Sequence, residues 1–185
     1  MVMVGACLIN ANANATTLIA FTLDELTAQS DEIVTGTITD STSFLNENRI
    51  YTLQRVKVSE AVFGAYRAGD VVEVVTAGGN ADTYSQKVYG AAELKVGEQY
   101  LLFLKRHSIH GILMPTGMSQ GVCRIVKSSD NQKLQLMPLH LRARLVKRNE
   151  AHNRRFKIAL PWLIEKRSLN EVLAEIRKII ENTYK

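Results

Sequence analysis

The chain is poor in cysteine, with two in 185 residues. Cys7 lies inside a leader that we expect to be removed, which leaves Cys123 alone in the rest of the chain. A disulfide framework of the kind that staples small secreted domains is therefore excluded. Because Cys123 lies in a strand-like run between Val122 and Ile125, we interpret it as a small buried apolar residue and not as a nucleophile.

Long apolar runs and aromatic residues are also scarce. After the leader, no apolar run approaches the roughly 20 residues needed to span a bilayer, so we expect no transmembrane segment in the mature chain. Aromatic residues make up 6% of the sequence, and the predicted strands carry no row of them on which bases could stack. This scarcity argues against nucleic acid as the partner.

Recognisable catalytic and metal-binding patterns are missing as well. His107 and His110 lie in a predicted turn without a nearby cysteine or acidic cluster, so we interpret them as solvent-facing and not as zinc ligands. The stretch 117–121 fits the letters of the G-x-S-x-G nucleophile elbow, but that motif requires a strand-to-helix turn, and here it lies between predicted strands. We therefore expect a non-enzymatic protein with no catalytic residues, no metal ligands and no cofactor.

Positive charge is absent from the start of the chain, since no Lys or Arg precedes Arg49. Residues 1–15 nevertheless read as an apolar run followed by small residues that end in Ala-Asn-Ala, the pattern of an export signal with an A-x-A cleavage site. We predict a signal peptide over 1–15 and a mature protein that begins at Thr16, in the periplasm or outside the cell. Because such signals normally begin with positive charge, the true start is expected to lie upstream.

Two alternatives stay open for this leader. Val4-Gly5-Ala6-Cys7 loosely resembles the lipobox of bacterial lipoproteins, in which Cys7 is the lipidated residue and anchors the protein. A tail on a cytoplasmic protein is the other alternative. We favour cleavage over lipidation because only three residues precede the lipobox-like stretch.

The excess of positive charge is concentrated in one segment. The net charge is +5, and segment 140–157 carries seven basic side chains against the single acid Glu150. The basic residues are Arg142, Arg144, Lys147, Arg148, Arg154, Arg155 and Lys157. A run of this kind is most often a solvated connector, and the alternative is a site for a polyanion such as nucleic acid.

The body of the chain is predicted to be β-structure. Short runs rich in β-branched residues recur between turn residues, a spacing typical of an antiparallel barrel or sandwich. The polar stretch 41–48 is predicted to be a loop, and 99–105, the most hydrophobic run after the leader, is expected to be a central strand. The predicted strands are 32–40, 50–63, 71–76, 99–105, 109–114, 122–126 and 133–137, and 82–90 is predicted to be a weaker, more exposed strand or a loop.

Two of these strands are predicted to depart from regular pairing. Gly36 lies at the centre of its strand, where glycine usually marks a bend or a bulge. In the following strand the apolar residues switch from odd to even positions between Leu53 and Val56. A side-chain period of two cannot slip by one residue without a bulge, so we predict a bulge near Gln54-Arg55.

Helices are predicted at both ends of the mature chain. Thr22 and Glu25 have the spacing of a capping box, which begins a short helix that runs to Ser30. Ser168 and Glu171 repeat that spacing ahead of an apolar stripe with helical period. The stripe is made of Leu169, Val172, Leu173, Ile176, Ile179 and Ile180. We expect this C-terminal helix to pack against the β-structure; the alternative is a helix that binds a partner or a membrane surface.

The order of these elements and several short motifs resemble a known group of proteins. A short helix that ends at 28–31 precedes the strand with Gly36, and Val62-Phe63-Gly64 closes the next strand. Segment 71–79 and the glycine turn that leads into 95–104 complete the pattern. This layout is similar to an uncharacterised family of exported bacterial proteins and to the netrin-like OB-fold domain of tissue inhibitors of metalloproteinases. The resemblance covers about residues 23–126.

The resemblance implies an antiparallel OB-like barrel with a short N-terminal helix. With the C-terminal amphipathic helix that the apolar stripe predicts, the expected fold is mainly β with one helix at each end of the mature chain. The resemblance also implies a rigid exported domain that binds protein through its loops and its terminus, which makes Thr16 and Thr17 candidate partner-binding residues. The inhibitors themselves act through an N-terminal cysteine. Since no cysteine lies near Thr16, that mechanism is not carried over.

These observations predict a chain of four parts and a binding function. The parts are a signal peptide (1–15), an OB-like domain (16–138), a basic connector (139–160) and a C-terminal helical segment (161–185). We expect an exported domain that binds an unidentified protein at the cell envelope, with a protease as one candidate. The alternative is binding of nucleic acid or another polyanion through an OB fold and segment 140–157.

Overall fold

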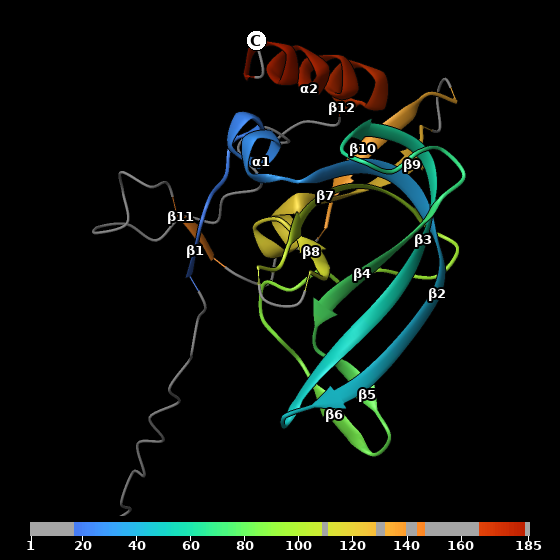
Figure 1. The fold of residues 1–185 in the computed structure, drawn as a ribbon, viewed down its shortest axis with the longest axis vertical. Helices are drawn as coiled ribbons and strands as arrows, with labels where there is room; N and C mark the ends of the chain where they lie inside the picture. The colour runs from blue at the N-terminus through green and yellow to red at the C-terminus, as the bar shows by residue number, and fades with distance from the viewer. Residues whose placement is uncertain (1–16, 109–110, 129–131, 140–143, 147–166, 184–185) are drawn as a thin grey trace, which may run out of the picture.

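The computed structural model describes residues 17–108, 111–128, 132–139, 144–146 and 167–183. Within these residues the protein is mainly β, as expected, with a large sheet and two α-helices (Figure 1). The strands are β1 (Thr17–Ile19), β2 (Glu32–Asn46), β3 (Arg49–Phe63), β4 (Val71–Ala77), β5 (Gly79–Ala81), β6 (Tyr84–Gln86), β7 (Gln99–Arg106), β8 (Leu113–Pro115), β9 (Val122–Lys127), β10 (Leu134–Pro138), β11 (Arg144–Val146) and β12 (Arg167–Ser168). The helices are α1 (Leu23–Gln29), α2 (Leu169–Thr183) and the short 3-10 helix η1 (Met118–Gly121).

The large sheet has the strand order β12-β10-β9-β7-β2-β3-β4-β8. Its neighbouring strands are antiparallel except for β4 and β8, which run parallel and pair through Val74 and Leu113. One edge of β7 is shared, because its first half pairs with β9 and its second half pairs antiparallel with β8. Strand pairing therefore leads from β7 through β2, β3, β4 and β8 back to β7.

β2 and β3 form a long hairpin, and the prediction of a loop over 41–48 is wrong. Segment 41–46 pairs residue by residue with segment 49–54. The turn consists of Glu47 and Asn48, with φ angles of 46° and 62°. Two successive residues with positive φ make the tight turn whose twist matches that of the flanking strands. Pairing with β3, and not an apolar pattern, holds this polar part of β2 in a strand.

The bulge predicted near Gln54-Arg55 lies on the other strand of the hairpin. β3 pairs without interruption with β4 over 51–57. The register shifts between Ile38 and Asp40, so the extra residue is Thr39 on β2, opposite Arg55. Over 51–57 β3 itself is regular, so Leu53 and the buried Val56, three residues apart, lie on opposite faces of the sheet.

β7 is the central strand, as its composition predicts, and it separates two apolar cores. Tyr100, Leu102 and Leu104 pack into one core with valines of β2, β3 and β4. Leu101 and Phe103 point to the other side and pack into a second core against α1 and α2. Because side chains alternate along a strand, a run that is apolar at every position fits only a strand covered on both faces.

Both predicted helices are present and cover the second core. The capping box of α1 is formed, since the Thr22 hydroxyl accepts from Glu25 N and the Glu25 carboxylate accepts from Thr22 N. The apolar stripe of α2 is buried at its first four positions and packs on α1 and the sheet, as expected. Figure 1 shows α2 lying across the end of the sheet beside α1. In the described part of the chain, neither helix combines the length and apolar character needed to cross a membrane.

Cys123 lies on β9 in the second core and is completely buried. Burial in these apolar surroundings raises the pKa of its thiol far above the ordinary range. Because the thiolate is the reactive form, Cys123 acts as a small apolar side chain, in agreement with its interpretation from the sequence.

Candidate functional site

The outer face of β2, β3 and β4 carries a set of side chains that neither core uses. Strand register places these side chains in three rows, because directly paired residues share a face. The rows are Phe44–Tyr51–Ala77, Thr42–Leu53–Val75 and Asp40–Arg55–Glu73. The face therefore has an aromatic row at the hairpin end, an apolar row beside it and a row of charges next to that.

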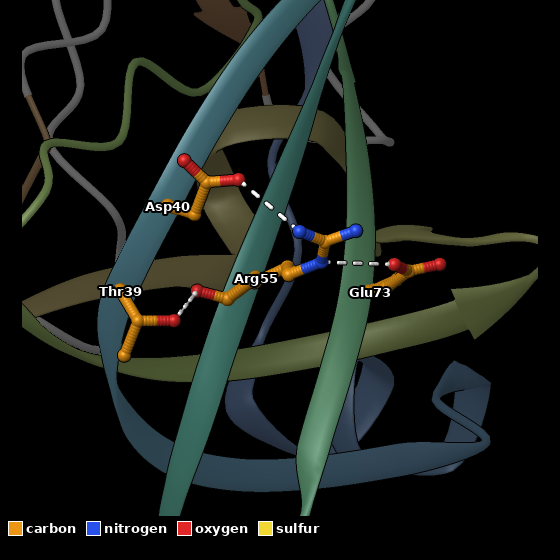
Figure 2. Close-up of polar contacts among 4 residues, drawn as sticks. All are labelled: Thr39, Asp40, Arg55 and Glu73. Carbon is orange, nitrogen blue, oxygen red and sulfur yellow. Dashed lines mark hydrogen bonds and ion pairs between the residues drawn. The ribbon is translucent and has the colours of Figure 1, made fainter.

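The charged row is a three-strand ion-pair network centred on Arg55 (Figure 2). Arg55 Nε donates to Glu73 Oε1 at 3.2 Å, and Arg55 Nη1 lies 3.4 Å from Asp40 Oδ2. All three side chains are about half exposed. Exposed pairs of this kind contribute little stability, about 0–1 kcal/mol each. They place a guanidinium between two carboxylates on an accessible surface.

The bulge at Thr39 makes this network possible. Before it, even-numbered residues of β2, such as Val34 and Ile38, face the interior; the extra residue then moves the even-numbered Asp40 to the outer face. The Thr39 hydroxyl donates to Arg55 O at 3.1 Å, which fastens the bulge to β3 (Figure 2). A bulge beside a functional surface commonly re-aims a side chain in this way.

The aromatic and apolar rows continue into a cleft. The rings of Phe44 and Tyr51 are stacked with centroids 6.1 Å apart, within the range of favourable aromatic pairs. Beyond Leu53 and Val75, a cleft of about 530 Å³ opens toward β8 and the loop before it. The residues that line it are Leu53, Tyr66, Val71, Glu73, Val75, Arg106, Gly111, Ile112 and Leu113.

A second candidate region is the N-terminal segment, where the sequence analysis proposed partner contacts. Gln120 on η1 accepts from Phe21 N and donates to Ile19 O, both at 2.9 Å, and its side chain is 1% exposed. This amide clamps a segment that lies 99 residues away in the sequence. The sequence analysis missed Gln120, because no local pattern marks such a long-range contact.

β1 pairs in parallel with β11, and Thr17 is the register partner of Arg144. A candidate partner-binding residue and a candidate polyanion-binding residue are thus neighbours in one small sheet. The other candidate residues lie outside the described residues: Cys7, Thr16, Arg142, Lys147, Arg148, Arg154, Arg155 and Lys157. The leader 1–15 and most of the basic connector lie outside them as well.

Ser119 is the serine of the G-x-S-x-G-like stretch, and its surroundings are those of a structural residue. It lies on η1 with 2% of its surface exposed, and its hydroxyl has no hydrogen-bond partner among the described residues. A nucleophilic serine needs an adjacent base and an open approach. In the described ranges, moreover, no three His, Cys, Asp or Glu side chains gather as a metal site.

A third polar region lies at the start of β7, in a cleft of about 220 Å³. Tyr100 Oη donates to Glu98 Oε2 at 2.6 Å, and Arg124 Nη1 donates to Glu98 Oε1 at 3.2 Å. The bond from Tyr100, helped by Arg124 and opposed by burial, lowers the pKa of Glu98 below its ordinary value of 4.5. Burial and the bond to Glu98 raise the pKa of Tyr100 above its usual range. These groups satisfy one another, which is typical of a structural network.

Replacing Tyr100 with phenylalanine is expected to raise the pKa of Glu98 toward 4.5. A carboxyl whose pKa is lowered by folding stabilises the protein above its unfolded pKa, and this stability is lost as pH falls through the folded pKa. The urea midpoint of Tyr100→Phe should therefore lie below that of the unmodified protein at neutral pH. The difference should shrink as pH falls below about 4.5. Tyr89→Phe, at an exposed position, is the control; a Tyr100→Phe difference that is constant with pH contradicts the assignment.

Comparison with protein-family models and with curated proteins gave no match. The similarity to the netrin-like OB-fold domains therefore stays an expectation that rests on element order and short motifs. The functional argument therefore rests on the geometry of the described residues. On the outer face of β2, β3 and β4, aromatic, apolar and charged side chains lie together, and most of them are at least partly exposed.

Proposed function

We propose that this protein is an exported, non-enzymatic domain with an OB-like barrel, and that it binds a protein partner at the cell envelope. The binding surface is the outer face of β2, β3 and β4 together with the cleft beside β8. The observation that carries this proposal is the combination on one face of an arginine paired with two carboxylates, two stacked aromatic rings, and a cleft lined by both apolar and charged side chains.

The strand pairing supports the barrel in this proposal. β2, β3 and β4 form an antiparallel meander, β4 runs parallel to β8, and β7 pairs antiparallel with both β8 and β2. This is the strand order expected of a five-stranded OB barrel with one parallel contact. In such barrels the second and third strands carry the usual binding face, which corresponds here to β3 and β4.

The composition of the face supports a protein as the partner. Tyrosine, phenylalanine and arginine are enriched in the centres of protein interfaces, where they contribute most of the binding energy. Arg55 is already oriented by Asp40 and Glu73, so less conformational entropy is lost when a partner binds it. A nucleic-acid surface needs a groove of unpaired positive charge. In this row one cation lies between two carboxylates.

The test is site-specific photo-crosslinking of the full chain in the envelope of its host. A crosslinking residue at Thr42 samples the outer face, and one at Glu181 on α2 is the control. We expect one envelope protein to be captured repeatedly from Thr42 and not from Glu181. Capture should weaken at least tenfold in Tyr51→Ser and Arg55→Ala, as is usual for residues at the centre of an interface.

The same experiment can overturn the proposal. Equal capture from both positions, or capture that is insensitive to Tyr51→Ser and Arg55→Ala, excludes the outer face as the binding surface. Salt-sensitive DNA binding that is lost on deletion of 140–157 would instead favour the polyanion alternative. The unfolding midpoint of each variant must match that of the unmodified protein for the comparison to hold.

A further inference from the structure

The inner face of the β2–β3 hairpin changes from apolar to polar along its length. Near the helices, the row Ile38–Val56–Val72 is fully buried in the first core. The next inward rows are Ser41–Gln54–Val74 and Ser43–Thr52–Thr76. Gln54 and Thr76 are only 2% and 4% exposed. Ser43 and Thr52 are partly exposed and Ser41 is exposed, so these rows run from the interior to the open side of the sheet.

A cleft of about 550 Å³ lies against this polar inner face. This volume is within the range of about 300–1,000 Å³ that small-molecule sites occupy. The β5–β6 hairpin and the segment before β7 form its other walls, and Figure 1 shows β5 and β6 beside the far end of β2 and β3. The polar side chains that line it are Ser41, Ser43, Thr52, Gln54, Thr76, Asn80, Ser85, Gln86, Lys87 and Glu93.

Ser43 and Thr52, which line the cleft from β2 and β3, use their hydroxyl hydrogens within the protein. The Thr52 hydroxyl donates its single hydrogen to Gly78 O at 2.7 Å. The Ser43 hydroxyl, 2.9 Å from Thr52 Oγ1, must then be the donor of that pair. With its hydrogen used, Ser43 Oγ keeps a free acceptor lone pair. The Gln54 amide is best satisfied with its nitrogen on the carbonyls of Val74 and Thr52, at 3.0 and 3.1 Å.

The charges that line the cleft balance. Lys87 Nζ lies 4.0 Å from Glu93 Oε1, and no other charged side chain lines the cleft in the described ranges. A charged ligand would find no unbalanced opposite charge here. The strand-forming backbone groups of β3 are also used on both edges, by β2 and β4, so a peptide cannot add to this strand by main-chain pairing.

We propose that this cleft is a binding site for a neutral saccharide. The cleft is lined by hydroxyl and amide side chains, and its charges balance. Hydroxyl groups that already donate their hydrogen within the protein can only accept another hydrogen bond. These properties match a ligand that is uncharged and presents several O–H donors. The site is separate from the outer face, because Ser41 and Ser43 alternate along β2 with Thr42, which faces the other way. A test of saccharide binding at this cleft is therefore independent of a test of protein binding at the outer face.

The test is a titration of the full chain with maltose, cellobiose, lactose and chitobiose, in which binding is monitored by the backbone-amide NMR signals. We expect at least one of these disaccharides to shift the signals of residues 41–43 and 78–80 at millimolar concentration. Ser43→Ala should weaken that binding by several-fold to about tenfold, the usual effect of losing one hydrogen bond. Ser41→Ala, at an exposed position, gives a second variant whose folding is not in question.

Thr42→Ala is the matched control, because it removes a hydroxyl between the two serines but on the opposite face. It should leave saccharide binding unchanged. Absence of shifts with all four disaccharides overturns the proposal, as does binding that Ser41→Ala and Ser43→Ala leave intact. Shifts of the same signals with trialanine and not with the saccharides would assign the cleft to a peptide instead, and also overturn it.

Discussion

Phe103→Ala is expected to destabilise the protein by about 3–5 kcal/mol, the usual cost of deleting a fully buried aromatic ring. Phe103 has no exposed surface and lies in the core between β7 and the two helices, with Leu26 and Val172 among the residues of that core. The loss leaves a cavity that α1, α2 and the sheet cannot fill together, because each is fixed by other contacts. Urea unfolding at neutral pH, followed by circular dichroism, measures the change.

Phe44→Ala is the matched control for this effect. The same side chain is removed, but Phe44 is 40% exposed on the outer face, where its main partner is Tyr51. We expect a clearly smaller loss than for Phe103→Ala, because the ring stays partly exposed and the aromatic pair adds only about 0.5–1.5 kcal/mol beyond the area that it buries. Equal losses for the two variants would mean that the core between sheet and helices does not control stability.

Gly36→Ala is expected to destabilise the protein by about 1–3 kcal/mol, although the unfolded chain alone favours alanine by about 0.4–1 kcal/mol. A Cβ at this position would lie 2.6 Å from the main-chain oxygen of Lys57 and 2.6 Å from a methyl group of Val56. The main-chain oxygen belongs to the paired strand β3, so it cannot move without disturbing the ladder. The sign of the change in the urea midpoint therefore shows whether the steric clash with β3 outweighs the entropic advantage of alanine in the unfolded chain.

Thr37→Ala is the comparison for Gly36→Ala, because it alters the next residue of β2, which is partly exposed. If Thr37→Ala changes stability only slightly and Gly36→Ala lowers it markedly, the destabilisation comes from the close approach of β2 and β3 at Gly36. A more stable Gly36→Ala protein would mean that β2 and β3 lie further apart at this point than the structure places them.

Several elements were predictable because their signals are local. The capping box of α1 involves residues three apart, and the apolar stripe of α2 repeats with the period of one helix. The continuous apolar run of β7 predicted a strand covered on both faces. Gly36 marked an irregularity, and the register shifts between Thr35 and Gly36. In each case the information lies within one short segment.

The sequence by itself determined the secondary structure that local periodicity and capping specify, the buried character of Cys123 and the mainly β class. Tertiary structure alone decided the length of the β2–β3 hairpin, the strand that carries the bulge, the Asp40–Arg55–Glu73 row and the clamp formed by Gln120. The charged row and the clamp join residues that are between 15 and 101 positions apart. A side-chain period fixes which residues share a face of one strand, but register with another strand depends on pairing and packing across the whole sheet.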